Sequence, residues 1–139
     1  MNNIKIIYAT KTKHSKKIAE AIGKALSIEA FNIKDNPVIE ETDAIFIVGG
    51  IYGGQSLPKL IEFVKNLDGE KIKNAVLITS SASKKQGQES IRSILEEKNI
   101  NILDELICQG SFLIMKFGHP NKDDIQEAVD FANKLVGNL

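Results

Sequence analysis

The chain lacks most of the features that mark secreted and membrane-spanning proteins. It contains one cysteine, Cys108, so no internal disulfide can form, which agrees with a reducing compartment. No apolar run approaches the roughly 20 residues that a helix needs to cross a bilayer. The first residues show no charged region followed by an apolar stretch, as a signal peptide would. We therefore expect a cytoplasmic protein without a membrane span.

The chain also has no net charge, because its 18 basic residues balance its 18 acidic residues. A general nucleic-acid binder needs an excess of basic side chains to meet phosphates, so we expect no nucleic-acid partner. The balance is uneven along the chain, since residues 1–36 contain seven lysines and three acidic residues. This local excess fits either a solvated helix end or a surface that attracts anions.

What the sequence does contain is a regular alternation of strand and helix patterns. A chain of 139 residues fits one domain, over residues 1–139, that buries a substantial core. Such alternation gives a parallel α/β sheet with helices on both faces, and five strands fit the order 2-1-3-4-5. Apolar patterns predict strands at 4–9, 28–33, 44–48, 74–79 and 103–115, and helices at 14–26, from 56–58, around 91–95 and from 120–121.

Three local features refine this outline. Gly49 and Gly50 are predicted to end the third strand, and Gly110 to mark a bulge or break in the last one. Ten residues are few for the crossover between the second and third strands, so we expect a short helical turn around 37–42. Cys108 lies within an apolar run and is interpreted as a core residue, since free cysteines are usually buried.

In open α/β sheets the ligand lies beyond the carboxyl ends of the strands, where the strand order reverses. Three segments fall at that edge, namely 10–15, 49–56 and 79–87. All three are rich in glycine, serine or threonine. Their concentration at one end of the predicted sheet is a stronger indication of a binding site than any one of them alone.

The first segment combines hydroxyl side chains with the start of a helix. The free N–H groups of a first helical turn point at an anion, and the helix dipole favours negative charge. The spacing T-x-T-x-x-S resembles the phosphate loop of flavodoxins, which holds the monophosphate of FMN. The resemblance implies a three-layer flavodoxin-like sandwich, FMN as cofactor, and phosphate contacts from Thr10, Lys11, Thr12, Lys13, His14 and Ser15. His14 fits a phosphate donor as well as a surface position at the helix start.

The second segment resembles the loop that flanks the flavin in flavodoxins. Its glycine pairs let the backbone approach a flat ring closely. The resemblance implies that Tyr52 stacks on the ring and that the peptide at Gly53 flips with the redox state of the flavin. The same residues would also suit a plain turn with Tyr52 covering apolar surface. The predicted contacts here are Gly50, Ile51, Tyr52, Gly53 and Gly54.

The third segment departs from the resemblance, because it has no aromatic residue to cover the other face of the flavin. That face is then open or covered by a partner protein. The resemblance implies that this segment borders the pyrimidine side of the ring, through Ser80, Ser81, Ala82 and Ser83.

Other anion-binding proteins with similar sheets are excluded by their motifs. A response-regulator receiver needs acidic residues where this chain has Ala9, Thr10 and Val48. A low-molecular-weight phosphatase needs an arginine six positions after its cysteine, where Cys108 is followed by Ile114. No triphosphate or dinucleotide glycine motif is present, and two isolated histidines make no metal site.

The sequence therefore predicts an FMN-binding electron-transfer protein or a redox accessory subunit of a reductase, similar to small bacterial flavodoxin-domain proteins. Its partner would be a redox protein, either a reductase or an electron acceptor. One alternative is an FMN-dependent oxidoreductase of the quinone reductase or protoporphyrinogen oxidase type. Another is a flavodoxin-fold binding module that has lost the flavin. No residue is assigned a catalytic role.

Overall fold

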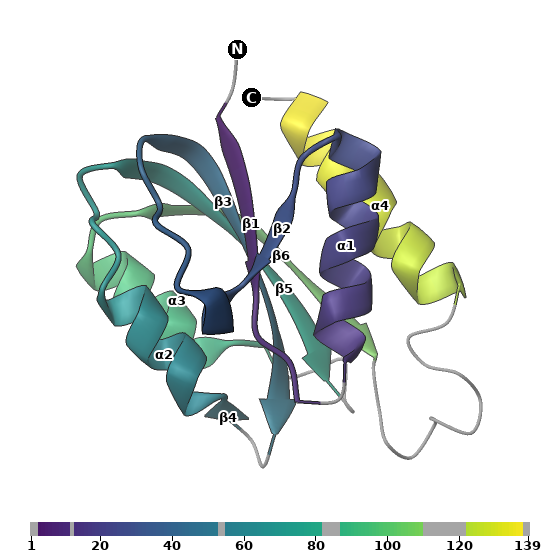
Figure 1. The fold of residues 1–139 in the computed structure, drawn as a ribbon, viewed down its shortest axis with the longest axis horizontal. Coiled ribbons are helices and arrows are strands. Elements are labelled where there is room, and N and C mark those ends of the chain that lie inside the picture. Colours follow the sequence, from purple (N-terminus) through teal and green to yellow (C-terminus); the bar gives the residue numbers. More distant parts are fainter. Residues whose placement is uncertain (1–2, 12, 53–54, 82–86, 110–121, 138–139) are drawn as a thin grey trace.

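The computed structural model describes residues 3–11, 13–52, 55–81, 87–109 and 122–137 (Figure 1). Strands and helices alternate along most of the chain, as the apolar pattern predicts. The strands are β1 (Ile4–Tyr8), β2 (Ala30–Asn32), β3 (Thr42–Tyr52), β4 (Gln55–Ser56), β5 (Ile72–Ser81) and β6 (Asn101–Gln109). The helices are α1 (His14–Leu26), the 3-10 turn η1 (Ile33–Asp35), α2 (Pro58–Lys65), α3 (Glu89–Glu97) and α4 (Lys122–Gly137).

One sheet runs through the molecule in the order β2-β1-β3-β5-β6, with parallel pairing at every step. The two-residue strand β4 lies outside this path and pairs antiparallel with the end of β3. Counting the five parallel strands alone, the order is 2-1-3-4-5, and the predicted flavodoxin-like fold is confirmed. The strand order reverses between β1 and β3, because the chain first adds β2 on one side of β1 and then β3 on the other.

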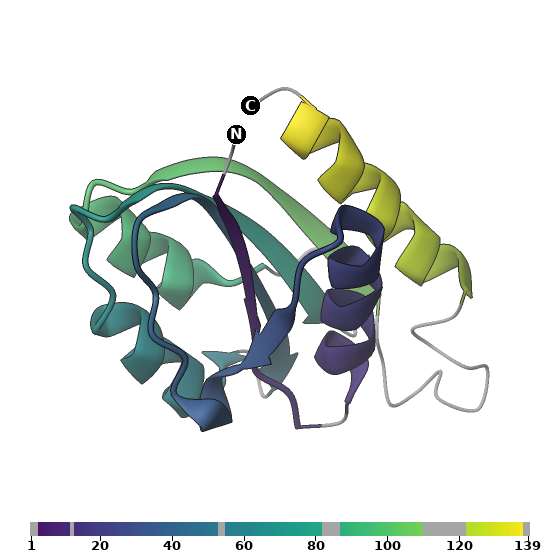
Figure 2. The ribbon, with the colours of Figure 1, turned by 45° about the horizontal axis from the view of Figure 1, so that its top comes forward.

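Two helical layers enclose the sheet, α2 and α3 on one face and α1 and α4 on the other (Figures 1 and 2). Leu60, Val64, Ile91 and Leu95 from α2 and α3 are buried against Ile45, Ile47 and Leu77 of the sheet. Ile18, Ile22, Ala128 and Ala132 from α1 and α4 are buried against Ile6, Phe46, Val76 and Ile78. Alternate residues of β3 thus face opposite cores, as expected of a strand covered on both sides. Cys108 is buried in the second core, as predicted.

The predicted helical turn around 37–42 is wrong. The turn in this crossover is η1, which begins where the Asn32 side chain accepts a hydrogen bond of 3.0 Å from the Lys34 N–H. It ends at Asn36, whose φ of 48° is left-handed, and Pro37 follows directly. Asparagine tolerates this conformation, and the residue before a proline is disfavoured in a right-handed helix. The crossover therefore turns before residue 37.

The end of the third strand is also different from the prediction, because β3 does not stop at Gly49 and Gly50 but continues to Tyr52. A Cβ atom on Gly49 would come within 2.7 Å of Leu60 Cδ2 and 2.9 Å of Gln88 Oε1. Gly49 therefore serves close packing inside the strand rather than a turn. The predicted bulge at Gly110 and the predicted start of the last helix at 120–121 lie outside the described residues.

None of the helices in the described part of the chain is long and apolar enough to cross a membrane.

Candidate functional site

The carboxyl edge of the sheet has a step at the point where the strand order reverses. β1 ends at Tyr8, level with Val48 of β3, and the Ala9 N–H donates a hydrogen bond of 3.1 Å to the Val48 carbonyl. β3 continues past this level to Tyr52, and β5 continues to Ser81. The segment after β1 therefore runs beside the projecting end of β3. This is the place where open α/β sheets bind their ligands.

The projecting strands bring the second and third predicted segments together. Gly50 is in register with Ser80, and both are buried. Gly50 and Ile51 belong to β3, and Ser80 and Ser81 to β5, so these predicted contact residues lie on strands rather than in loops.

The first predicted segment leads directly into α1. Lys13 adopts the left-handed conformation, with φ 70°, and offers no side-chain hydrogen bond to the helix start. The first turn also contains no acidic residue. His14 is 8% exposed and Ser15 is fully buried, whereas Lys11 and Lys13 are exposed. The N-terminus of α1 thus presents backbone N–H groups and the positive end of its dipole beside the step in the sheet.

Buried polar atoms without a partner gather at the same end. Within the described residues, the buried side-chain nitrogen and oxygen atoms that lack a hydrogen bond are Thr10 Oγ1, Ser15 Oγ, Ser56 Oγ and Gln88 Oε1. Each follows β1, β3 or β5 along the chain, so all four lie at the carboxyl edge. Leaving such an atom unpaired costs about 1–3 kcal/mol. Thr10 and Ser15 flank the helix start, where two hydroxyl groups suit the acceptor oxygens of a phosphate.

Part of the predicted site lies outside the described residues. This holds for Thr12, Gly53, Gly54, Ala82 and Ser83, and for the side chains of Tyr52 and Ser81. The phosphate contact of Thr12, the stacking of Tyr52 and the peptide flip at Gly53 therefore stay predictions.

A polar cluster anchors the chain just after the third segment. Glu105 of β6 accepts hydrogen bonds at Oε2 from Thr79 Oγ1 at 3.3 Å and from the Gln88 N–H at 3.1 Å. Its other carboxylate oxygen pairs with Arg92 Nη2 of α3 at 2.6 Å, and this hydrogen bond raises the pKa of Arg92 above its ordinary value. A Cβ atom on Gly87 would overlap the Glu105 carboxylate. One side chain thus ties the residues before and after 82–86 to the sheet.

Gln88 extends this anchorage to the neighbouring strands. It is 1% exposed, and its Nε2 donates to the carbonyls of Ile47 at 3.3 Å and Ile78 at 3.2 Å. These carbonyls belong to β3 and β5, so the amide bridges the two strands that project at the site.

The sequence predictions do not include Gln88 or Glu105, and they place Ser56 in the second segment without assigning it a contact. The available signal for Glu105 was an acidic residue next to the apolar Leu106 and Ile107 in a predicted strand. The sequence predicts Ser56 at a helix start, but Leu57 is the residue that precedes α2, and Ser56 belongs to β4. No pattern in the sequence marks Gln88, because its contacts come from residues 10 and 41 positions away.

Fold and site together define a doubly wound α/β protein in which the N-terminus of α1 lies at the topological switch point. The chain belongs to the flavodoxin domain family, which it matches over residues 5–129. It is 32% identical over 138 residues to an uncharacterised protein, MJ0298, of the archaeon Methanocaldococcus jannaschii, covering 91% of this chain and 92% of that one.

Solved structures show the same fold at low sequence identity. A short-chain flavodoxin associated with a non-canonical PDU bacterial microcompartment superimposes with a TM-score of 0.71, at 16% identity and with 99% of each chain covered. A variant of the Fusobacterium nucleatum flavodoxin, bound to flavin mononucleotide, gives a TM-score of 0.67 at 17% identity, covering 96% of this chain and 94% of that one. The resemblance to flavodoxins on which the sequence predictions depend is therefore confirmed.

Proposed function

We propose that the protein binds FMN at the carboxyl edge of its sheet and transfers electrons to or from a redox partner protein. The observation that carries this proposal is the pair of buried, unpartnered hydroxyl groups, Thr10 Oγ1 and Ser15 Oγ, beside the N-terminus of α1. Such hydroxyl groups are costly when they are buried without a partner and favourable when a phosphate accepts hydrogen bonds from them. The Fusobacterium nucleatum flavodoxin of the same fold is bound to flavin mononucleotide, which supports this ligand.

In this proposal Thr10, Thr12 and Ser15 donate to the phosphate oxygens, and backbone N–H groups of residues 11–15 complete the anion site. The residues at the ends of β3 and β5 border the ring and limit its contact with water. Bound FMN supplies the electron-transfer chemistry, while the protein sets access and orientation. These ring contacts would come from Gly50, Ile51, Tyr52, Gly53, Gly54, Ser80, Ser81, Ala82 and Ser83.

A comparison of FMN with riboflavin tests the assignment directly, because riboflavin lacks only the phosphate. We expect saturable quenching of flavin fluorescence with one FMN per chain. We expect riboflavin to bind about 100-fold more weakly, the effect of losing two charge-assisted hydrogen bonds of roughly 1.5 kcal/mol each. No binding of either flavin would reject the proposed cofactor. Equal affinity for both would reject the role of Thr10 and Ser15.

A further inference from the structure

Five lysines lie at the end of the protein that carries the candidate site. We use the name lysine end for Lys13, Lys16 and Lys17 at the start of α1, Lys34 in η1 and Lys59 in α2. Four of these five side chains are exposed, and Lys16 is half-buried. Lys34 and Lys59 line one surface hollow of about 370 Å³ between η1 and α2, together with Glu62. Acidic residues are fewer in this part of the described chain: Asp35 lies in η1, Glu62 lines the hollow, Glu20 follows Lys17 in α1, and Glu89 begins α3.

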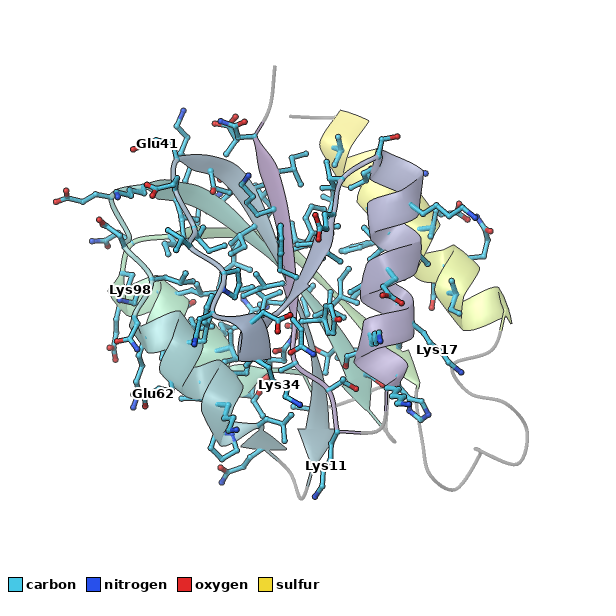
Figure 3. All side chains as sticks on the ribbon, in the orientation of Figure 1. Lys11, Lys17, Lys34, Glu41, Glu62 and Lys98 are labelled. Atoms are coloured by element: carbon cyan, nitrogen blue, oxygen red, sulfur yellow. The ribbon has the colours of Figure 1, made fainter. Side chains whose placement is uncertain are left out.

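Many acidic residues lie at the opposite end of the sheet. Exposed Glu29, Glu40, Glu41, Asp68 and Glu70 precede β2, β3 and β5 there. Lysines are mixed with them: Lys71 pairs with Glu40 at 3.2 Å, Lys73 pairs with Asp43 at 3.4 Å, and Lys24 and Lys65 are exposed in the last turns of α1 and α2. Figure 3 shows Lys11 and Lys17 at the end where β3 and β5 stop, and Glu41 at the other end. The net charge of zero therefore hides an uneven distribution, with an excess of lysines at the end that carries the candidate site and a mixture of acidic and basic side chains at the other end.

The two sides of the lysine end belong to different layers of the fold. Lys17 lies on α1, which covers one face of the sheet, and Lys59 lies on α2, which covers the other. One phosphate group cannot account for cations on both sides of the sheet.

We propose that the lysine end is the docking surface for an acidic redox protein. This inference rests on the proposed function, since electrons would pass where the flavin meets the surface. A protein with separated charges orients in the field of its partner, and complementary charge raises the rate of encounter. An acidic partner is attracted more strongly by the lysine end than by the opposite end, where carboxylates are exposed among the lysines. A long polyanion such as DNA would cover both ends, so the charge separation favours a compact acidic protein.

The chain offers a matched pair of variants for the test. Lys17 and Lys59 lie near the starts of α1 and α2, whereas Lys24 and Lys65 lie in the last turns of the same helices. All four side chains are exposed. Lys17→Glu with Lys59→Glu and Lys24→Glu with Lys65→Glu change the net charge equally, but only the first pair alters the lysine end. None of the four residues belongs to the predicted FMN contacts.

The probe is an acidic iron–sulfur ferredoxin, whose binding is measured by calorimetry at low and at physiological ionic strength, with and without FMN. We expect the Lys17/Lys59 variant to bind at least about tenfold more weakly than the natural protein at low salt, as for several charge pairs lost from an interface. We expect the Lys24/Lys65 variant to stay within about twofold, and added salt to reduce the difference. Circular dichroism verifies that both variants fold.

Equal weakening in both variants would overturn the proposal, because net charge alone would then govern binding. Tighter binding of basic cytochrome c than of ferredoxin, or of a short DNA duplex than of either protein, would overturn it as well. A failure of the proposed FMN binding can be distinguished from a failure of the docking proposal. If FMN does not bind but ferredoxin still distinguishes the two variants, the docking surface stands and the cofactor does not.

If one variant fails to fold, the salt dependence of ferredoxin binding to the natural protein tests the proposal instead. Binding of ferredoxin that weakens steeply between low and physiological ionic strength supports docking through charge. Binding that is insensitive to salt contradicts it.

Discussion

Ser15 is the residue at which ligand binding and stability have opposite requirements. Its hydroxyl is buried and unpartnered, so Ser15→Ala removes an atom that costs free energy in the unliganded protein. Alanine is also the better helix former. We expect the free energy of unfolding of the variant without FMN to be equal to that of the natural protein or about 1 kcal/mol higher. We expect FMN affinity to fall about tenfold or more, and riboflavin affinity to stay the same.

Urea unfolding and flavin titration measure the two effects separately. Ser93→Ala, at an exposed position of α3, is the control for a serine-to-alanine change in a helix. A loss of stability in Ser15→Ala without any change in FMN affinity would show that the hydroxyl serves the fold alone.

Asp43 makes the free energy of unfolding depend on pH in the acid range. Its carboxylate accepts a hydrogen bond of 2.8 Å from the Asn3 N–H and lies 3.4 Å from Lys73 Nζ, and these contacts lower its pKa. A carboxyl whose pKa is lower in the folded state stabilises the fold above its ordinary pKa, and this contribution disappears as the pH falls through the lowered value. We expect Asp43→Asn to destabilise the protein near neutral pH and to have a smaller effect at an acid pH at which the natural carboxyl is protonated.

Urea unfolding at both pH values measures the difference, with Glu41→Gln at the exposed neighbouring position as control. A difference between Asp43→Asn and the natural protein that is the same at both pH values would contradict the linkage.

At the scale of elements, Glu105 joins β6, α3 and the end of β5. Glu105→Ala would leave Arg92 without its carboxylate and the Gln88 N–H without its acceptor. Because the pair is partly exposed, we expect a loss of about 1–3 kcal/mol in the free energy of unfolding rather than the larger cost of a fully buried ion pair. Thermal or urea unfolding measures it, with Glu96→Ala on the exposed side of α3 as control. Equal stability of the two variants would show that the cluster contributes nothing.

The elements themselves could largely be predicted, but their ends and the polar contacts between them could not. A run such as 44–48 is apolar at every position because both faces of the strand are covered, and this pattern can be recognised in the sequence alone. Gly49 resembles a strand end in the sequence, whereas its role depends on Leu60 and Gln88, which the fold brings to it. The Glu105 cluster draws on three separated segments, so no local spacing encodes it.

At the scale of the whole molecule, the alternation of strands and helices predicted the order of the sheet, and the order located the site. The hydroxyl pattern of 10–15 could be interpreted because a helix start acts on an anion through nearby backbone groups. The separation of charge could not be seen in the same way. Lys17, Lys59 and Glu41 become two opposite ends only when the direction of each strand is known.

The pairing of β4 with the end of β3 is expected to be less stable than the parallel part of the sheet. The strand β4 is held to the sheet by two pairs, Ile51 with Ser56 and Tyr52 with Gln55, while the parallel strands beneath share long ladders and two covered faces. Because this pairing is short, we expect it to open at a lower free-energy cost than the pairing of β3 with β5. A ligand gripped by the β3–β4 hairpin would enter and leave without any global unfolding.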